Sequence, residues 1–231
     1  MDYSPFDYPP FAVAADAVIL TVIDGELAVA LVERSEEPWE GGLALPGGFI
    51  ASDEDADTAV SRVISEEIHL ESAHLEQLKT YSGVDRDPRM RIISVAFVAL
   101  LPTPEVSAGN RVSSVSFVPV STVSDLDLAF DHNVIVADAV ERVRSKFEYS
   151  TLATTMLPEA FTIEELRRLY ESVWGVELDA PNFRRKVLGT CGFVLPTGET
   201  RRGGRGRPAA LYQADSNGDA VLDPPIHREF K

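Results

Sequence analysis

Two runs of hydrophobic residues near the start of the chain are rich in β-branched side chains. They cover residues 18–23 and 27–32 and are joined through Asp24 and Gly25. Asp-Gly between two such runs favours a type I′ turn, in which both central residues have a positive φ. The pattern therefore predicts a β-hairpin.

The rest of the first 150 residues predicts four more elements. Apolar residues recur every three or four positions in two stretches, which is typical of helices, and two other stretches are β-rich. In chain order these are a helix over residues 55–68, strands over 92–101 and 112–120, and a helix over 133–147. This mixture predicts an α+β domain over residues 13–150, after an N-terminal tail of residues 1–12.

A segment of small and polar residues, 151–157, precedes Pro158 and is interpreted as a linker. The second domain, residues 158–231, has a well-marked first helix. Thr162 and Glu165 are spaced as a capping box, in which the hydroxyl accepts from the Glu165 amide and the carboxylate reaches back. Gly175 predicts the end of this helix.

A second, shorter helix is predicted after Asp179, a helix-capping residue type, and Pro181 is tolerated in its first turn. Short strands over residues 193–195 and 209–213 flank the loop 196–208. A helix, a turn, a basic helix and a hairpin with a basic, glycine-rich tip is the order of a winged helix-turn-helix domain.

The composition is that of a soluble globular protein. Of the 231 residues 45% are hydrophobic and 25% are charged, which excludes a disordered or collagen-like chain. The longest apolar run is shorter than the roughly 20 residues that span a bilayer, and the first residues do not have the order of a signal peptide. The single cysteine, Cys191, cannot form an internal disulfide or a Cys-based zinc site. We therefore expect a cytoplasmic protein without membrane contact.

The net charge of −16 is distributed unevenly. Residues 1–150 contain 26 acidic and 10 basic residues, whereas residues 151–231 contain 11 of each. Between residues 182 and 213, seven basic side chains stand against one acidic side chain. The two halves are therefore expected to have different partners, and a phosphate backbone suits the basic segment.

Residues 48–70 resemble the signature of the Nudix hydrolases, Gly-x5-Glu-x7-Arg-Glu-U-x-Glu-Glu-x-Gly-U, where U is aliphatic. The matching positions are Gly48, Glu54, Arg62, Ile64, Glu66, Glu67 and Leu70. In that family a loop and a helix gather carboxylates, which hold divalent cations beside a diphosphate. The resemblance implies a Nudix-like α/β/α sandwich, in which Glu54 and Arg62 fix the loop against the helix.

Two positions depart from the signature. Val63 stands where the family has a glutamate that acts as metal ligand or general base, and His69 stands where it has glycine. Because losing a positioned base costs about 10²- to 10⁴-fold in rate, we expect no efficient hydrolysis and assign no catalytic residue. Glu66 and Glu67 leave weak Mg²⁺ binding open, but no metal site or cofactor is required. The Cβ of His69 predicts an altered helix end.

Residues 81–95 resemble a segment of ADP-ribose-type Nudix domains, in which an Arg-Asp-Pro-Arg stretch precedes a core strand. Arg86 and Arg89 are candidate phosphate ligands, since a guanidinium fits phosphate oxygens in a bidentate way. A solvated charged loop is the equally weighted alternative for these two residues and the preferred interpretation for Arg91. Arg34 and Trp39 are further candidates; Trp39 could stack on a base or cover the core edge.

The basic segment and the altered Nudix box together resemble the Nudix-related transcriptional regulators of NAD metabolism, the NrtR family, over residues 13–213. The resemblance implies a homodimer that represses NAD biosynthesis or salvage genes, binds a pseudo-palindromic DNA operator, and responds to ADP-ribose or a related NAD metabolite. Glu66 and Glu67 are included with the four candidates above as ligand-binding residues. The predicted DNA-binding residues are Asn182, Arg184, Arg185, Lys186, Arg201, Arg202, Arg205 and Arg207.

A second hypothesis stays open: an active, Mg²⁺-dependent ADP-ribose pyrophosphatase to which the basic C-terminal domain is an accessory. The histidines His74, His132 and His227 carry no pattern and are expected to be solvent-facing or packed in the core. Cys191 is expected to be a packed small residue.

Overall fold

The structure is a computed structural model of the chain. It describes residues 4, 8–70, 75–102, 106–109, 111–202, 208–215, 221–223 and 225–228. Among these residues, no helix is long and apolar enough to cross a membrane.

The first domain contains two groups of strands, each followed by a helix. The predicted hairpin, the two later strands and both helices are present, and three further strands were not predicted. The elements are β1 (Ala12–Ile23), β2 (Glu26–Arg34), β3 (Leu43–Ala44), β4 (Gly47–Phe49), α1 (Ala56–Ile68), β5 (Leu75–Tyr81), β6 (Ile92–Leu100), β7 (Val112–Pro119), the 3-10 helix η2 (Val120–Asp125) and α2 (His132–Tyr149). The β1–β2 hairpin turns at Asp24 and Gly25, whose φ values of 51° and 84° are both positive, as predicted.

The strands form one mixed sheet. Its order is β3-β2-β1-β6-β5, with β4 paired to β1 and β7 to β2. The central strands β1 and β6 run parallel, whereas the hairpin and the edge pairs are antiparallel. β4 pairs with β1 in a register that places Gly47 opposite Asp16. The loop before α1 is thereby fixed against the middle of the sheet.

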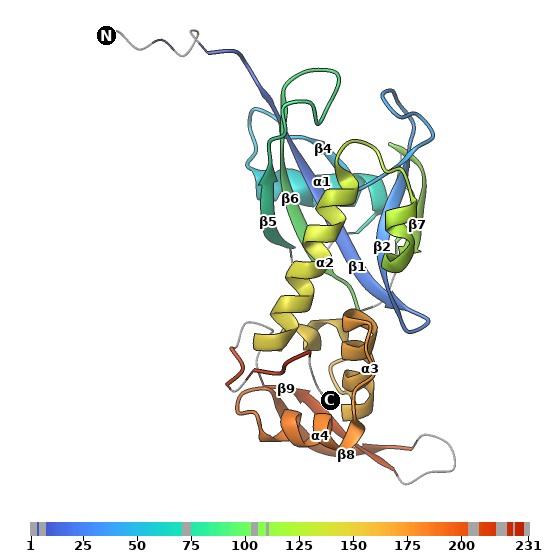
Figure 1. The fold of residues 1–231 in the computed structure, drawn as a ribbon, viewed down its shortest axis with the longest axis vertical. Helices are drawn as coiled ribbons and strands as arrows, with labels where there is room; N and C mark the ends of the chain where they lie inside the picture. The colour runs from blue at the N-terminus through green and yellow to red at the C-terminus, as the bar shows by residue number, and fades with distance from the viewer. Residues whose placement is uncertain are drawn as a thin grey trace.

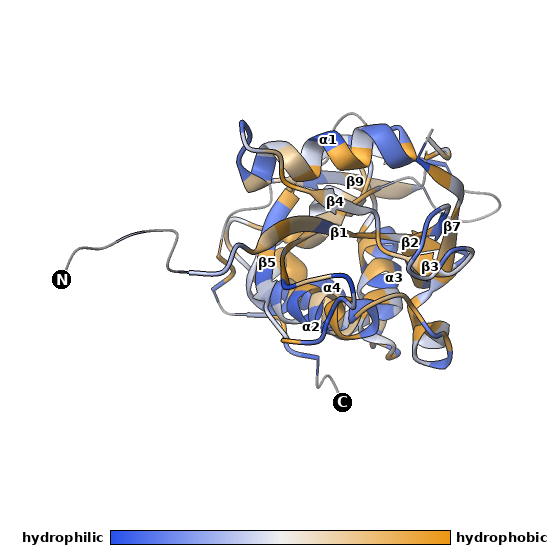
Figure 2. Ribbon diagram, turned by 90° about the horizontal axis from the view of Figure 1, so that it is seen from above, coloured by the Kyte–Doolittle hydropathy of each residue, from blue (hydrophilic) through white to orange (hydrophobic). Residues whose placement is uncertain are grey.

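The two long helices cover opposite faces of this sheet, as Figure 2 shows. Side chains alternate along a strand, so Ala17 and Ile19 of β1 pack in one buried cluster with Val60 and Ile64 of α1. Val18 and Leu20 of β1, together with the apolar face of α2, belong to a second cluster. The first domain is therefore the α/β/α sandwich that the resemblance implied.

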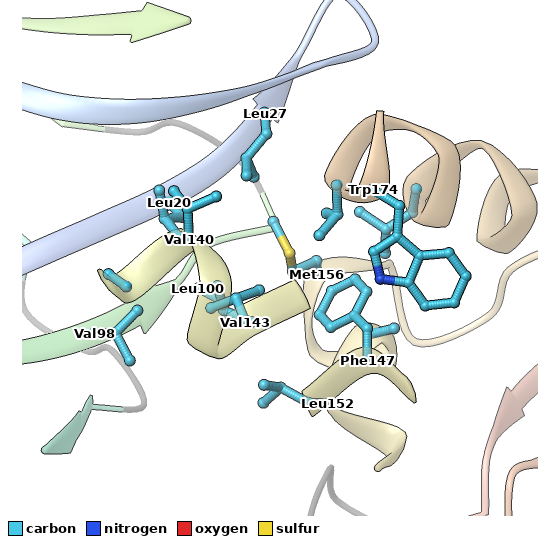
Figure 3. Close-up of a cluster of buried hydrophobic side chains, with 14 of the residues drawn as sticks. Leu20, Leu27, Val98, Leu100, Val140, Val143, Phe147, Leu152, Met156 and Trp174 are labelled. Atoms are coloured by element: carbon cyan, nitrogen blue, oxygen red, sulfur yellow. The ribbon is translucent and has the colours of Figure 1, made fainter. Parts of the chain in front are cut away.

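The segment predicted as a linker forms the 3-10 helix η3 (Thr151–Met156), and most of it is buried. Leu152 and Met156 of η3 pack with Leu100 of β6, Phe147 of α2 and Trp174 of the next helix in one cluster (Figure 3). The sequence suggested a connector because these residues are small and polar; threonine hydroxyls at 154 and 155 satisfy backbone carbonyls within η3, which allows the burial. The connection is a packed element, and the domain boundaries stay a prediction.

The C-terminal domain lies beyond the end of α2 (Figure 1) and consists of α3 (Ile163–Trp174), α4 (Ala180–Gly189) and the hairpin β8 (Val194–Arg201) and β9 (Ala209–Ala214). Both halves of the predicted capping box are present at Thr162 and Glu165, and Gly175 ends α3 with a φ of 69°. Asp179 caps α4 as predicted. This is the winged helix-turn-helix order that the sequence indicated.

Two predictions about single residues were wrong. His69 adopts the left-handed conformation (φ 54°) at the end of α1, and its N–H reaches the carbonyls of Ile64 and Ser65, so the helix end keeps the form that glycine would give it. A hydrogen-bond contact of 3.0 Å between His69 Nδ1 and Ser107 Oγ accompanies this backbone conformation. Cys191 is exposed rather than packed.

Candidate ligand pocket and DNA-binding surface

The loop before α1 is held by the ion pair that the sequence predicted. Arg62 donates from Nε and from a terminal nitrogen to the two carboxylate oxygens of Glu54, at 3.0 and 2.6 Å. The hydrogen bonds from Arg62, with one from the Ala51 amide, lower the pKa of Glu54 to about 2. Arg62 also donates to the carbonyl of Phe49 at 3.1 Å. The pair thus sets the distance between the loop and the helix.

Val63 lies where a metal-binding carboxylate is expected, and it is buried, with 1% of its surface exposed. A Cβ added to Gly48 would lie 3.0 Å from a Val63 methyl group, so the side chain packs directly under the loop. Neighbouring Val60 and Ile64 belong to the apolar cluster of α1. No oxygen ligand is available at this position of the helix.

A cavity of about 470 Å³ opens between strand β4, the neighbouring strands of the sheet and the start of α2. Its volume lies in the range of small-molecule sites. Four arginines face four acidic residues in its walls. The lining residues are Ala14, Asp16, Val32, Arg34, Ser35, Glu36, Ala44, Leu45, Gly47, Gly48, Phe49, Glu67, Arg86, Asp87, Arg89, Ile92, Arg111, Val112, Phe130 and His132.

Of the six predicted ligand-binding residues, the structure brings Arg34, Glu67, Arg86 and Arg89 into the lining of this cavity. Trp39 and Glu66 do not line it. The ring of Trp39 packs against Phe130, with 4.7 Å between ring centroids, and supports the wall from behind. Arg111 holds Glu66 at 3.1 Å.

The guanidinium groups in the cavity have different partners. Arg34 donates to the backbone carbonyls of Pro38 and Glu36, and it lies over the Phe130 ring. Burial, followed by the neighbouring charge of Arg89, lowers the pKa of Arg34. Arg89 forms a bidentate pair with Asp87, at 3.0 and 2.7 Å. Arg34 is therefore the better placed of these two to accept a new anionic partner.

Arg86 is buried in a network of ion pairs and hydrogen bonds that no sequence motif marks. It donates two hydrogen bonds to Asp131, at 3.0 and 2.7 Å, and a terminal nitrogen lies 3.6 Å from Asp16. Ser94 donates to the same Asp16 carboxylate. The sequence left two alternatives for Arg86, a phosphate ligand or part of a solvated loop. Neither includes this internal ion pair.

His132 also belongs to the site. Its Nδ1 accepts a hydrogen bond of 2.9 Å from the Leu45 amide, and its Nε2 lies 3.9 Å from Asp16. Because Nδ1 accepts this hydrogen bond, the ring carries its proton on Nε2, and burial, which lowers the pKa of His132, favours this neutral form. No motif marks Asp16, Phe130 or His132 in the sequence; only the fold brings β1 and the start of α2 together.

Glu67 projects from α1 into the cavity and accepts a hydrogen bond of 3.1 Å from the Gly47 amide. Burial raises the pKa of Glu67 to about 7, and the nearby Asp16 carboxylate adds to this effect. A Cβ added to Gly47 would lie 2.0 Å from an oxygen of Asp16, so any other residue here would displace that buried side chain.

The described residues do not form a cage for a resident divalent cation. No group of three or more His, Cys, Asp and Glu side chains among them is placed to hold a metal ion. Position 63 is apolar, and Glu66 is 39% exposed and shared between Arg62 and Arg111. Hard cations need several oxygen ligands, so these residues do not fit the magnesium site of a Nudix hydrolase.

The basic helix α4 presents polar side chains to solvent while it buries Phe183 and Val187. Arg184 and Arg185 are exposed. Arg185 donates to the side chain of Asn182 at 2.9 Å. Arg184 donates to the hydroxyl of Tyr212 on β9 at 3.2 Å, which links the helix to the wing.

In the wing, Arg201 is the last residue of β8 and Arg202 directly follows it, and both are exposed. Arg201 already has partners: it donates to Glu165 and to the Ala160 carbonyl, both at 2.7 Å. The other two predicted wing residues, Arg205 and Arg207, lie outside the described residues. A basic helix beside a basic wing is the arrangement that winged helix-turn-helix domains use on DNA.

The fold and the two sites define a Nudix-like domain joined to a DNA-binding winged helix. Residues 11–139 match the NUDIX domain family and residues 153–214 match the NrtR DNA-binding winged helix domain. The chain therefore belongs to the Nudix family, in the branch that carries an NrtR-type winged helix domain.

Relatives of both kinds are known. The ADPR responsive transcriptional repressor NtrR of Acinetobacter baylyi is 32% identical over 235 residues, covering 98% of this chain and 93% of that protein. An ADP-ribose pyrophosphatase of Methanocaldococcus jannaschii is 35% identical over 127 residues, covering 55% of this chain and 72% of that protein.

Solved structures agree with this assignment. Shewanella oneidensis NrtR complexed with a 27mer DNA superposes with a TM-score of 0.79 at 32% identity, covering 93% of this chain and 99% of that one. The NUDIX domain of the same protein complexed with ADP ribose gives a TM-score of 0.57 at 34% identity, covering 62% of this chain and 94% of that one.

Proposed function

We propose that this protein is a DNA-binding transcriptional repressor of NAD biosynthesis or salvage genes, whose Nudix domain senses ADP-ribose or a related NAD metabolite. The observation that carries the proposal is the pairing, in one chain, of an arginine-lined cavity without a metal cage among the described residues and a basic helix beside a basic wing. The A. baylyi relative, similar over nearly the whole chain, is named as an ADPR-responsive repressor.

The proposed DNA-binding form is a homodimer that reads a pseudo-palindromic operator, since two-fold symmetric proteins bind two-fold related half-sites. Arg185 and Asn182 are assigned to base edges, as both side-chain types suit the major groove. Arg184, Lys186, Arg201, Arg202, Arg205 and Arg207 are assigned mainly to phosphates.

The test is a titration of operator DNA at fixed salt, with and without saturating ADP-ribose. A coupling free energy of about 1–3 kcal/mol between the two sites changes the operator affinity roughly five- to 150-fold. Arg185→Ala is expected to weaken operator binding while the protein stays folded by circular dichroism. Equal operator affinities with and without ligand would remove the sensing role.

The proposal includes the loss of efficient hydrolysis, because Val63 supplies no oxygen where the reaction needs one. The competing function, an Mg²⁺-dependent ADP-ribose pyrophosphatase, is favoured by Glu66, Glu67 and the M. jannaschii relative. Release of phosphate from ADP-ribose in the presence of a phosphatase separates the two. If the wild type hydrolyses ADP-ribose rapidly and Glu67→Gln abolishes this activity, the protein is an enzyme. If hydrolysis appears only in Val63→Glu, the protein is a sensor derived from an enzyme.

A further inference from the structure

We propose that α2 carries the state of the ligand cavity to the DNA-binding helix as one rigid element. This inference rests on the proposed function, because it assigns the route by which that ligand site would regulate that DNA site. The helix has 18 residues, so it is about 27 Å long. Figure 1 shows it running from the sheet into the C-terminal domain.

The first end of α2 is part of the cavity wall. His132, its first residue, lines the cavity together with Phe130 just before it. Asp131, the N-cap residue, accepts both hydrogen bonds from Arg86, whose side chain is only 4% exposed. A ligand that contacts Arg86 or Phe130 therefore acts directly on the start of the helix.

The same end is tied to the loop that faces the cavity from the other side. The Leu45 amide donates to His132, and the Gly47 amide, two residues further on, donates to Glu67 of α1. The loop, α1 and α2 consequently share one hydrogen-bonded frame. A displacement of any part of this frame therefore moves the N-terminus of α2.

Between its ends α2 is held as a unit on the sheet. Its buried face belongs to the core cluster that also contains Val18 and Leu20 of β1. On its outer side, Asp138 accepts hydrogen bonds from Lys79 and Tyr81 of β5, at 3.0 and 2.8 Å. Packed helices shift as rigid bodies because close-packed cores do not deform continuously.

The second end of α2 is hydrogen-bonded to α3 of the C-terminal domain. The Tyr170 hydroxyl of α3 donates to the Phe147 carbonyl at 3.0 Å, and the Trp174 indole donates to the Arg144 carbonyl at 3.1 Å. In return, Arg144 Nε donates to the Val173 carbonyl at 2.8 Å. These bonds tie the backbone of each helix to side chains of the other, so a shift of one helix displaces the other.

A line of buried aromatic rings continues from α2 to the DNA-binding helix. Phe147 lies 5.2 Å from Tyr170, and Tyr170 lies 5.3 Å from Phe183, between ring centroids. Phe183 is fully buried on α4 between Asn182 and Arg184. The chain of contacts therefore ends beside the side chains assigned to DNA.

The test uses the full-length double variant Tyr170→Phe/Trp174→Phe, which keeps aromatic rings in the core but removes the two hydrogen bonds that side chains of α3 donate to α2. Its readout is the ratio of operator affinities with and without saturating ADP-ribose. We expect this ratio to fall at least threefold relative to the wild type, while ADP-ribose affinity stays within twofold. A merely structural role would lower the melting temperature and leave the ratio unchanged. Tyr149→Phe, on an exposed tyrosine of the same helix, is the matched control.

The outcomes separate this inference from the proposed function. If ADP-ribose leaves the wild-type operator affinity unchanged, the proposed function fails and the inference fails with it. If the wild type responds and the double variant keeps the wild-type ratio, only the inference fails. If the double variant does not fold, hydrogen exchange of the wild type decides: ligand-induced changes should reach residues 163–189, and changes confined to the first domain would overturn the route.

Discussion

The guanidinium of Arg34 lies 5.0 Å from the centre of the Phe130 ring and, among the residues that the structure describes, donates to two backbone carbonyls, those of Pro38 and Glu36. No carboxylate among the described residues forms an ion pair with it, unlike Arg86, Arg89 and Arg111 in the same cavity. An anionic ligand would therefore meet in Arg34 a positive charge that is oriented by its neighbours but not neutralised by a direct partner.

Replacing Arg34 by alanine is expected to weaken ADP-ribose binding roughly 10- to 150-fold, since a hydrogen bond to a charged group contributes about 1.5–3 kcal/mol. Arg34→Lys keeps the positive charge but lacks the bidentate guanidinium, so its ADP-ribose affinity should lie between those of the wild type and Arg34→Ala. Calorimetric titration measures both. Arg91→Ala is the control, because Arg91 donates to the Gly83 carbonyl and does not line the cavity. Wild-type affinity in Arg34→Ala would show that the ligand lies elsewhere.

Removing divalent cations is expected to leave ADP-ribose affinity within twofold. The charge of a diphosphate has to be balanced by guanidinium groups here, because Val63 is apolar and Glu66 is shared by Arg62 and Arg111. Titrations in EDTA and in excess Mg²⁺ compare the two states. A tenfold gain with Mg²⁺ would mean that the ligand completes a metal site with Glu66 and Glu67, as the sequence left open.

Local rules predicted most of the fold, because they depend on near neighbours in the chain. The Asp24-Gly25 turn, the helix 55–68 and the Thr162–Glu165 capping box all appeared as expected. The edge strand β5 did not appear in the pattern, since only Leu78 and Tyr81 of its seven residues are buried and a bulge interrupts its alternation.

The candidate site was predictable only where a motif carried it. The Glu54–Arg62 pair and the apolar position 63 could be read from spacing. Phe130 and His132 could not, because they reach the cavity through the packing of α2 on the sheet. At position 69 a local rule gave a wrong prediction, because it expected a residue with a Cβ to alter the helix end. The hydrogen bonds of the His69 amide and the contact of its side chain with Ser107 favour the left-handed conformation instead.

The stability of the protein is expected to fall as the pH rises from about 4.5 to about 7, through the contribution of Glu67. In the folded state its pKa is raised to about 7 from an ordinary value of 4.5. Between these values the unfolded chain releases the proton while the folded protein keeps it, so folding becomes less favourable with rising pH. Above pH 7 the loss in the free energy of unfolding caused by Glu67 reaches a constant value of about 3 kcal/mol.

Glu67→Gln isolates this effect, because the glutamine carbonyl can still accept from the Gly47 amide but does not titrate. Urea unfolding of both proteins is measured at pH 5 and pH 8. The free energy of unfolding of the variant, relative to that of the wild type, should be a few kcal/mol higher at pH 8 than at pH 5. If the two proteins show parallel pH dependences, Glu67 is ionised in the cavity at neutral pH.

Operator binding is expected to depend steeply on salt, with a slope of log K against log [salt] near −5 if six phosphates are contacted per dimer, at about −0.9 per phosphate. Adjacent residues of the wing should contribute unequally. Arg201 is already paired with Glu165 at 2.7 Å, so its charge is partly balanced before DNA arrives. Arg202 is exposed and has no hydrogen-bond or ion-pair partner among the described residues.

Arg202→Ala should therefore make the salt slope shallower by about 0.9 for each phosphate that the arginine neutralises, whereas Arg201→Ala should change it less. Fluorescence anisotropy with labelled operator, at four or more salt concentrations, measures both slopes under the same conditions. Equal reductions in both variants would mean that DNA displaces Glu165, and unchanged slopes in both would place the wing away from the phosphates.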